Sequence, residues 1–424
     1  GTAAVGARAT ASPGVAGSSG DGFSLVAGQR LAPAPHKRDE REWRSLGRII
    51  DRDGDLQFAH FRRRSKLGQG GQAIVHKVEL EHTGVFFAMK TYDKRDALED
   101  DYVERILNEE KVLLGCDHPF IGTLFATFST ETQVHFLLDY AEGLSLYQLC
   151  ERFQNYRMPE EAHVRFYAAE VLLAVQYLHM QGFIWRDIKP ENVLLTKEGH
   201  VRCYDFNLSY IGQPTRQSIA KVHAKIPADD LAAALQFWRP REKRHISTPS
   251  GSTLVVQPEV LTNSFLGTEQ YMAPEIVNAT GHTSSADWWS YGCLLFDLIY
   301  GYTPFRGARQ EQTFENILRR PLVFPKDPVV SDEMKDLIGS LLQKDQWKRL
   351  GNRQGAEDIK KHPWFDGLDW ARIRDRAPPY DPVMLMKKDI AKLAKGADEE
   401  GNVRNATLKP IAEDAVPAED PKAP

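Results

Sequence analysis

The fold of this chain is decided by one stretch, which reads Phe183-Ile184-Trp185-Arg186-Asp187-Ile188-Lys189-Pro190-Glu191-Asn192-Val193-Leu194-Leu195. Asp187 is placed to accept the proton of a substrate hydroxyl, Lys189 to steady a transferring phosphoryl group, and Asn192 to hold a metal ion. A polar turn between a helix and a strand would explain the polarity of this loop, but not the order of its residue types. We therefore predict a loop for phosphoryl transfer in which Asp187 and Lys189 are the catalytic residues.

A second acidic motif follows this loop. Asp205-Phe206-Asn207 comes directly after a strand pattern, which would bring the Asp205 carboxylate close to Asn192. Carboxylate and amide oxygens suit a Mg²⁺ ion that bridges phosphate groups, so Asp205 and Asn192 are the predicted metal ligands. Asn207 stands where such motifs have glycine, and asparagine tolerates a left-handed backbone better than most residues.

Upstream features predict where the phosphates bind. The glycine-rich run from Leu67 to Val75 lies between two strand patterns, where glycines let backbone amides approach phosphate oxygens, although a tight hairpin turn is an alternative interpretation. Lys90 ends a buried strand pattern and would pair with phosphate oxygens and with a helical carboxylate. The alternative for Lys90 is a strand-end lysine that reaches solvent. Glu109 is the predicted partner of Lys90, with Glu110 the second choice.

Composition excludes several classes of protein. The 424 residues are 42% hydrophobic with a net charge of -4, which leaves no basic excess for a dedicated nucleic-acid binder. The four cysteines have neither metal-site spacing nor the density of a disulfide framework, and they favour a reducing, cytoplasmic environment. The longest apolar stretch is too short to cross a bilayer. Because the chain begins with Gly1 and lacks a signal pattern, we expect that its natural start lies upstream.

The pattern of apolar residues along the chain predicts a two-lobed α+β protein. We expect a disordered tail over residues 1–60, a small sheet lobe with one main helix over 61–141, and a mainly helical lobe over 142–365. An insert at about 210–260 lacks periodicity, and 366–424 is predicted to be an extension that ends in a disordered tail. The insert carries the basic run 239–245, for which a solvated loop is the favoured interpretation over nuclear targeting or peripheral membrane association.

These motifs together resemble the AGC group of serine/threonine protein kinases, above all plant phototropin kinase domains and the related fungal flippase kinases. The resemblance runs from about residue 60 to 382 and includes the long insert after Asp205, with Trp185 in place of the usual His or Tyr. It implies the bilobal protein-kinase fold, ATP and Mg²⁺ as cofactors, and protein substrates phosphorylated on Ser or Thr. The implied ATP-binding residues are Leu67, Gly68, Gln69, Gly70, Gly71, Val75, Ala88, Lys90, Glu109, Leu138, Asp139, Ala141 and Leu194.

The resemblance also implies how the chain is switched on. Phosphorylation of Ser264, by an upstream kinase or by the chain itself, would add charge for Arg186 and Arg105 to bind. Thr268 would then contact Asp187 and Lys189. Glu275 would pair with Arg349, and Asp287 would hold the catalytic-loop backbone, both in structural roles. Of the two acids with which related kinases read a substrate arginine, Glu191 matches one, whereas Ser145 occupies the position of the other.

Two further hypotheses compete with an active kinase. A nucleotide-binding pseudokinase scaffold is suggested by Ala73, Asn207 and Ser145, which depart from the family pattern. None of these departures removes a catalytic carboxylate. Alternatively, the chain is the output module of a larger sensor kinase whose sensor precedes Gly1.

Overall fold

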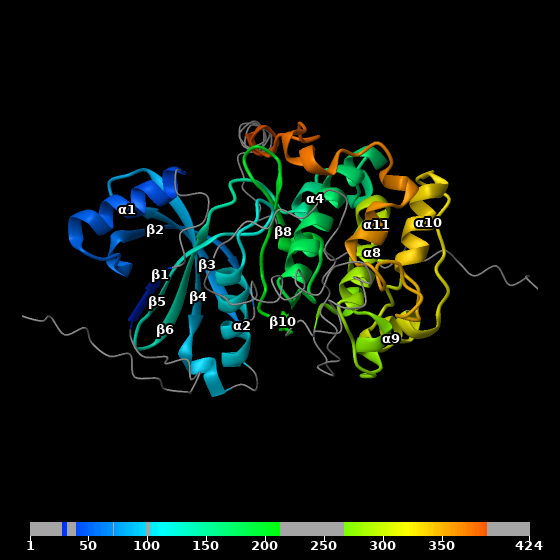
Figure 1. Cartoon of the computed structure of the whole chain (residues 1–424), viewed down its shortest axis with the longest axis horizontal. Helices are drawn as coiled ribbons and strands as arrows, with labels where there is room; N and C mark the ends of the chain where they lie inside the picture. Colours follow the sequence, from blue (N-terminus) through cyan, green and yellow to red (C-terminus); the bar gives the residue numbers. More distant parts are fainter. Residues whose placement is uncertain (1–27, 32–39, 71, 99–101, 213–266, 388–424) are drawn as a thin grey trace, which may run out of the picture.

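The computed structural model describes residues 28–31, 40–70, 72–98, 102–212 and 267–387. The chain forms a sheet-containing lobe and a larger helical lobe, joined after β6 (Figure 1). The predicted α+β, bilobal fold is confirmed. No helix in these described ranges is both long enough and apolar enough to span a membrane.

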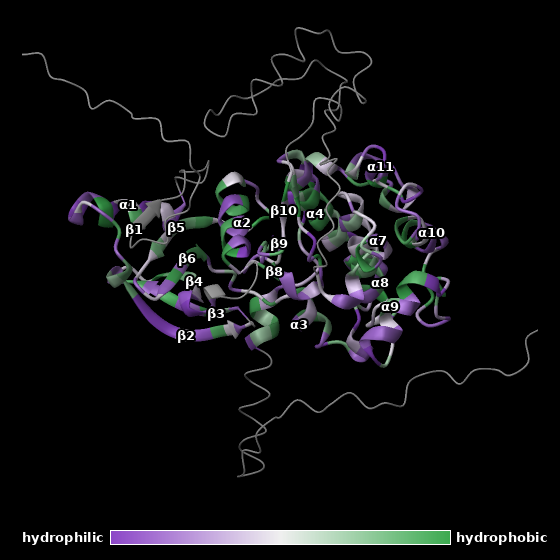
Figure 2. Cartoon of the chain, turned by 90° about the horizontal axis from the view of Figure 1, so that it is seen from below, coloured by the Kyte–Doolittle hydropathy of each residue, from purple (hydrophilic) through white to green (hydrophobic). Residues whose placement is uncertain are grey.

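The first lobe is built on a six-stranded antiparallel sheet in the order β1-β5-β6-β4-β3-β2. β4 alternates its side chains between the two faces, so that Phe87 and Met89 point one way whereas Lys90 and Tyr92 point the other. The edge strand β2 is exposed after Phe61 and hydrophilic over most of its length (Figure 2). The strands are β1 (Gly28–Leu31), β2 (Phe61–Gln69), β3 (Ala73–Leu80), β4 (Val85–Asp93), β5 (Leu124–Ser129) and β6 (Gln133–Asp139).

Two helices, rather than the one predicted, cover this sheet. α2 (Tyr102–Gly115) packs on the face that carries Lys90, because Tyr102 and Ile106 join the same core as Tyr92. α1 (Arg41–Asp53) packs on the opposite face. The two helices therefore cover opposite faces of the central strands, with α2 on the face that carries Lys90.

The prediction of a disordered tail up to residue 60 is wrong for two segments. β1 pairs with β5, and α1 buries Leu46 and Ile49 against Phe87 and Met89 of β4. Arginines occupy much of the outward side of α1, which lowered the apparent hydrophobicity of this region in the sequence. α1 has only four large apolar residues, which form a narrow stripe. Their role becomes clear only in the folded chain, where they cover one face of the sheet.

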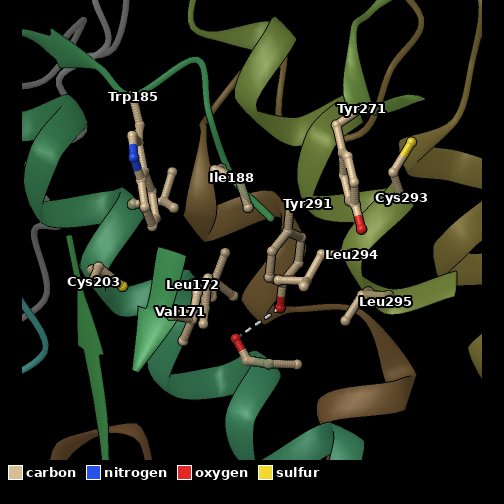
Figure 3. Packing of buried hydrophobic residues seen from close by; sticks show 14 of the residues in the cluster. Val171, Leu172, Trp185, Ile188, Cys203, Tyr271, Tyr291, Cys293, Leu294 and Leu295 are labelled. Atoms are coloured by element: carbon tan, nitrogen blue, oxygen red, sulfur yellow. Dashed lines mark hydrogen bonds between the residues drawn. The ribbon is translucent and has the colours of Figure 1, made fainter. Parts of the chain in front are cut away.

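The second lobe is organised around two buried helices, α4 (Glu161–Met180) and α8 (Ser285–Tyr300). Figure 3 shows the side chains of these helices interdigitating, with Tyr291 donating a hydrogen bond of 2.9 Å to the carbonyl of Ala168. Further helices surround this pair: α3 (Leu146–Cys150), α7 (Pro274–Val277), α9 (Gln310–Arg319), α10 (Asp332–Leu341) and α11 (Ala356–Lys360).

Two small antiparallel ribbons lie where the lobes meet. β8 (Val193–Leu195) pairs with β9 (Val201–Cys203), and β7 (Phe183–Ile184) pairs with β10 (Tyr210–Ile211). The catalytic-loop stretch runs from β7 to β8, and the acidic motif lies between β9 and β10. This topology brings the two motifs side by side, facing the sheet of the first lobe.

Candidate active site

Three charged groups from different elements meet between the lobes. The Lys90 ammonium on β4 lies 2.8 and 2.9 Å from the two carboxylate oxygens of Glu109 on α2, and 2.8 Å from Oδ1 of Asp205. Burial alone would lower the pKa of Lys90, but Asp205 and Glu109 raise it well above its usual value. Burial raises the pKa of Glu109, whereas Lys90 lowers the pKa of Asp205 despite burial. Glu110, the second choice for this partner, instead accepts a hydrogen bond of 3.3 Å from Thr127.

A second cluster surrounds Asp187. Its Oδ1 accepts a 2.8 Å hydrogen bond from the Thr268 hydroxyl, and its Oδ2 lies 2.8 Å from the Lys189 ammonium. Lys189 also donates to the Thr268 hydroxyl at 2.7 Å. The contacts of Thr268 with Asp187 and Lys189 are thus present, and they hold the Asp187 carboxylate in one orientation.

The chemistry of the donor set fits a magnesium ion bound together with phosphates. Asn192 uses its amide nitrogen to donate to Asp187 at 2.7 and 2.9 Å, which leaves its amide oxygen as the acceptor for a cation. Asp205 supplies a carboxylate that is 36% exposed. One carboxylate, one amide oxygen and phosphate oxygens are a common Mg²⁺ ligand set.

The buried carboxylate of Asp287 on α8 fixes the backbone of the catalytic loop. The Asp287 carboxylate accepts hydrogen bonds from the backbone amides of Trp185 at 2.8 Å and Arg186 at 2.7 Å. Arg186 has a positive φ of 65°, a backbone conformation that residues other than glycine rarely adopt. The two hydrogen bonds from Asp287 hold the backbone in this conformation. The indole nitrogen of Trp185 donates to the carbonyl of Asp205 at 3.1 Å, and its ring packs 5.4 Å from that of Phe206.

The geometry of the acidic motif differs from the expectation in one respect. Asp205, with φ of 63°, is the residue in the left-handed region, whereas Asn207 has no positive φ. The tolerance of asparagine for a left-handed backbone is therefore not needed at position 207, because the position with positive φ lies two residues earlier. Asn207 presents a buried side-chain oxygen without a partner among the described residues.

Most of the residues predicted to line the nucleotide site belong to the sheet of the first lobe, whereas Leu194 lies in β8. Val75 pairs with Lys90, and Ala88 pairs with Leu138, which is buried. The glycine-rich turn joins β2 and β3, where the amide of Gly70 donates to the carbonyl of Ala73 at 2.9 Å. Leu67 is 44% exposed, and Gly68 and Gln69 end β2. Asp139 ends β6 shortly before Ala141, and Leu194 lies in β8. Gly71 is outside the described residues.

The activation residues divide into those that the structure brings together and one that it does not describe. Arg349 forms a bidentate pair with Glu275 at 2.6 and 2.9 Å, with both side chains almost fully buried. Arg186 and Arg105 lie close enough that Arg105 adds to the effect of burial in lowering the pKa of Arg186 to about 10. Ser264 lies outside the described residues.

Next to the catalytic loop is an acidic pair of which the sequence analysis found only one member. Asp297 on α8 accepts a 2.5 Å hydrogen bond from the Tyr271 hydroxyl. Burial, and to a lesser extent the charge of Glu191, raises the pKa of Asp297 to about 6. Asp297 was overlooked because it interrupts an apolar stretch that reads as plain core.

Ser145 has a local structural role instead. Its hydroxyl accepts from the amide of Gln148 at 3.1 Å, and the Gln148 side chain accepts from the amide of Ser145 at 3.1 Å. This reciprocal pair caps the N-terminus of α3. Ser145 therefore serves as the N-cap of α3 in this structure.

Residues 61–225 and 250–365 match the protein kinase domain family. This match covers more than half of the chain and includes every cluster described above, so the chain belongs to the protein kinase family.

Relatives place the chain more narrowly, among serine/threonine kinases of the AGC group. It is 40% identical to Phototropin-1A of Oryza sativa subsp. japonica over 85% of this chain and 37% of that protein. It is 36% identical to Serine/threonine-protein kinase AGC1-5 of Arabidopsis thaliana over 86% of this chain and 67% of that protein. It is 34% identical to Protein kinase PVPK-1 of Phaseolus vulgaris, over 87% and 66% respectively. The chain spans well under half the length of the phototropins that it matches.

Proposed function

We propose that this chain transfers the γ-phosphoryl group of ATP, with Mg²⁺ bound, to serine or threonine hydroxyls of proteins. ATP supplies the phosphoryl group, and Mg²⁺ neutralises the charge of its phosphates. Lys90, held by Glu109, would bind phosphate oxygens, while Asp205 and Asn192 would hold the metal ion. Asp187 would orient the substrate hydroxyl and accept its proton, and Lys189 would stabilise the charge of the phosphoryl group.

The observation that carries this proposal is that both clusters are assembled at once. Lys90 contacts both Glu109 and Asp205, and Asp187 contacts both Lys189 and Thr268. A scaffold that only bound nucleotide would have no need for the second cluster. The departures at Ala73, Asn207 and Ser145 leave every one of these contacts in place.

The Asp187→Asn substitution tests this function. It keeps the size of the side chain and removes the proton acceptor, so phosphate transfer to generic Ser/Thr substrates should fall by at least a hundredfold. ATP binding should persist, because Asp187 makes no contact with Lys90. Wild-type protein that transfers no more phosphate than Asp187→Asn, even when Ser264 is phosphorylated, would refute the proposal.

The acidic pair suggests which substrates are preferred. Glu191 lies within the short 3-10 turn Pro190–Asn192 of the catalytic loop, and its charge contributes to raising the pKa of Asp297. Two neighbouring carboxylates, one of them within the catalytic loop, favour a substrate with an arginine near the phosphorylated hydroxyl. Peptides that differ only by arginine or glutamine at these positions would measure this preference.

Control of activity is proposed to depend on Ser264. A phosphate there would give Arg186 and Arg105 a shared anion, which would relieve the repulsion between two neighbouring guanidinium groups. Either an upstream kinase or the chain itself would add this phosphate. We further propose a cytoplasmic location, where ATP and Mg²⁺ are available.

A further inference from the structure

Tyr204 lies directly before the candidate metal ligand Asp205, and its side chain reaches away from the metal site. The hydroxyl of Tyr204 lies 3.0 Å from Oδ1 and 3.3 Å from the carbonyl oxygen of Asp139. Asp139 ends β6, where the chain passes from one lobe to the other. The backbone amide of Tyr204 donates to the carbonyl of Asn192 at 3.0 Å. One residue thus connects both candidate metal ligands to the inter-lobe connection.

Besides this hydroxyl, two other segments hold the carboxylate of Asp139. The backbone amide of Thr123 donates to Oδ1 at 2.7 Å, and Arg202 on β9 forms an ion pair with Oδ2 at 3.2 Å. The backbone amide of Asp139 donates to the carbonyl of Thr123 at 3.0 Å. Asp139 is therefore fixed against β9 and against the connection between α2 and β5.

A glycine makes room for this arrangement. A Cβ atom on Gly122 would lie 2.4 Å from Cε1 and 2.5 Å from Cδ1 of Tyr204, closer than any real contact. The amide of Gly122 also donates to the carbonyl of Cys203 at 2.9 Å, so the backbone here cannot easily withdraw. Only a residue without a side chain at position 122 lets the Tyr204 ring pass to Asp139.

We infer that Tyr204 is a positioning residue that sets the affinity of this kinase for the adenosine part of its nucleotide. It acts through Asp139, whose backbone belongs to the segment that we expect to meet adenine. When the Tyr204 hydroxyl is present, the inter-lobe connection is held at a fixed distance from Asp205. The base and the phosphates of one nucleotide can then bind at the same time. This inference rests on the proposed function, since it requires ATP between the lobes.

The test is titration calorimetry of adenosine and of ADP with Mg²⁺ against purified wild-type and Tyr204→Phe proteins. Loss of one hydrogen bond to a charged group should weaken adenosine binding about tenfold. ADP with Mg²⁺ should weaken by a similar factor, and in kinetics KM for ATP should rise while KM for the peptide and kcat stay within about twofold. Tyr177→Phe is the matched control, because it removes a partly buried hydroxyl that accepts from the amide of Asp117 at 3.0 Å, on the same α2–β5 connection.

A double-mutant cycle tests the steric part. Gly122→Ala should weaken adenosine binding in the wild-type background, because the ring must move. It should cost little further in a Tyr204→Ala background, where the space is empty.

The possible outcomes are distinct. Tyr204→Phe that binds adenosine like the wild type would overturn the inference alone, as would a loss confined to ADP with Mg²⁺ or an equal loss in Tyr177→Phe. Wild-type protein that binds neither ligand would overturn the proposed function and this inference with it.

Discussion

The preference for an arginine near the phosphorylated hydroxyl should depend on pH in a way that other steps of the reaction do not. Asp297 carries the effect, because its pKa is raised from 3.8 to about 6, first by burial and then by the charge of Glu191. A raised pKa means that the carboxyl group takes up its proton as the pH falls through 6. The ionised form that attracts a guanidinium is present above this value and is lost below it.

The size of the effect follows from this pKa. The Asp297 carboxyl is roughly nine-tenths ionised at pH 7 and roughly one-tenth ionised at pH 5. The ratio of kcat/KM for an arginine peptide to kcat/KM for the matched glutamine peptide should therefore fall about tenfold between these pH values. Taking the ratio removes the pH dependence of Asp187 and of phosphate binding, which both peptides share.

The assay is steady-state phosphorylation of the two peptides from pH 5 to 8, with Asp297→Asn as the matched variant. Asp297→Asn keeps an acceptor for the Tyr271 hydroxyl but carries no charge, so its ratio should be lower than that of the wild type at pH 7 and should change less between pH 7 and pH 5, where Glu191 remains the only acid of the pair. A wild-type ratio that does not change between pH 7 and pH 5 would refute the reasoning. An Asp297→Asn variant that retained the wild-type ratio would show that the arginine is bound elsewhere.

Two further predictions concern stability. Arg349→Ala leaves the Glu275 carboxylate buried without its partner, so the free energy of unfolding, measured in urea, should fall by about 3 to 5 kcal/mol. A loss below about 1 kcal/mol would show that the two side chains do not form a buried ion pair. Leu46→Ala, at a side chain of α1 that is 1% exposed, should lower the free energy of unfolding by about 2 to 5 kcal/mol in the same measurement. Arg48→Ala, on the exposed side of that helix, should lower it by less than about 0.5 kcal/mol. Equal effects of the two substitutions would show that α1 does not pack on the sheet.

The sequence predicted those parts of the site that lie in continuous motifs. Lys189 and Asn192 stand at fixed spacings from Asp187, and a short loop allows few arrangements of such residues. Glu109 was also found, because helical periodicity restricts which residues of α2 can face Lys90.

Other features depend on contacts between distant segments. Asp297 lies in an apolar helix, and only its neighbours Tyr271 and Glu191 distinguish it from a core residue. Tyr204 and Asp139 are 65 residues apart, and nothing local to either indicates that they meet. The helix α1 was missed for a related reason, because the sheet face that it covers is assembled from strands that follow it in the chain.

The contact between Trp185 and the acidic motif has a consequence for the choice of inhibitors. Phe206 is fully buried beside the Trp185 ring, and the indole nitrogen holds the carbonyl of Asp205. A compound that needs the phenylalanine to swing outward would have to break this hydrogen bond and leave a cavity beside a tryptophan. Compounds that occupy the nucleotide site and leave Phe206 in place are therefore the better starting points for this kinase.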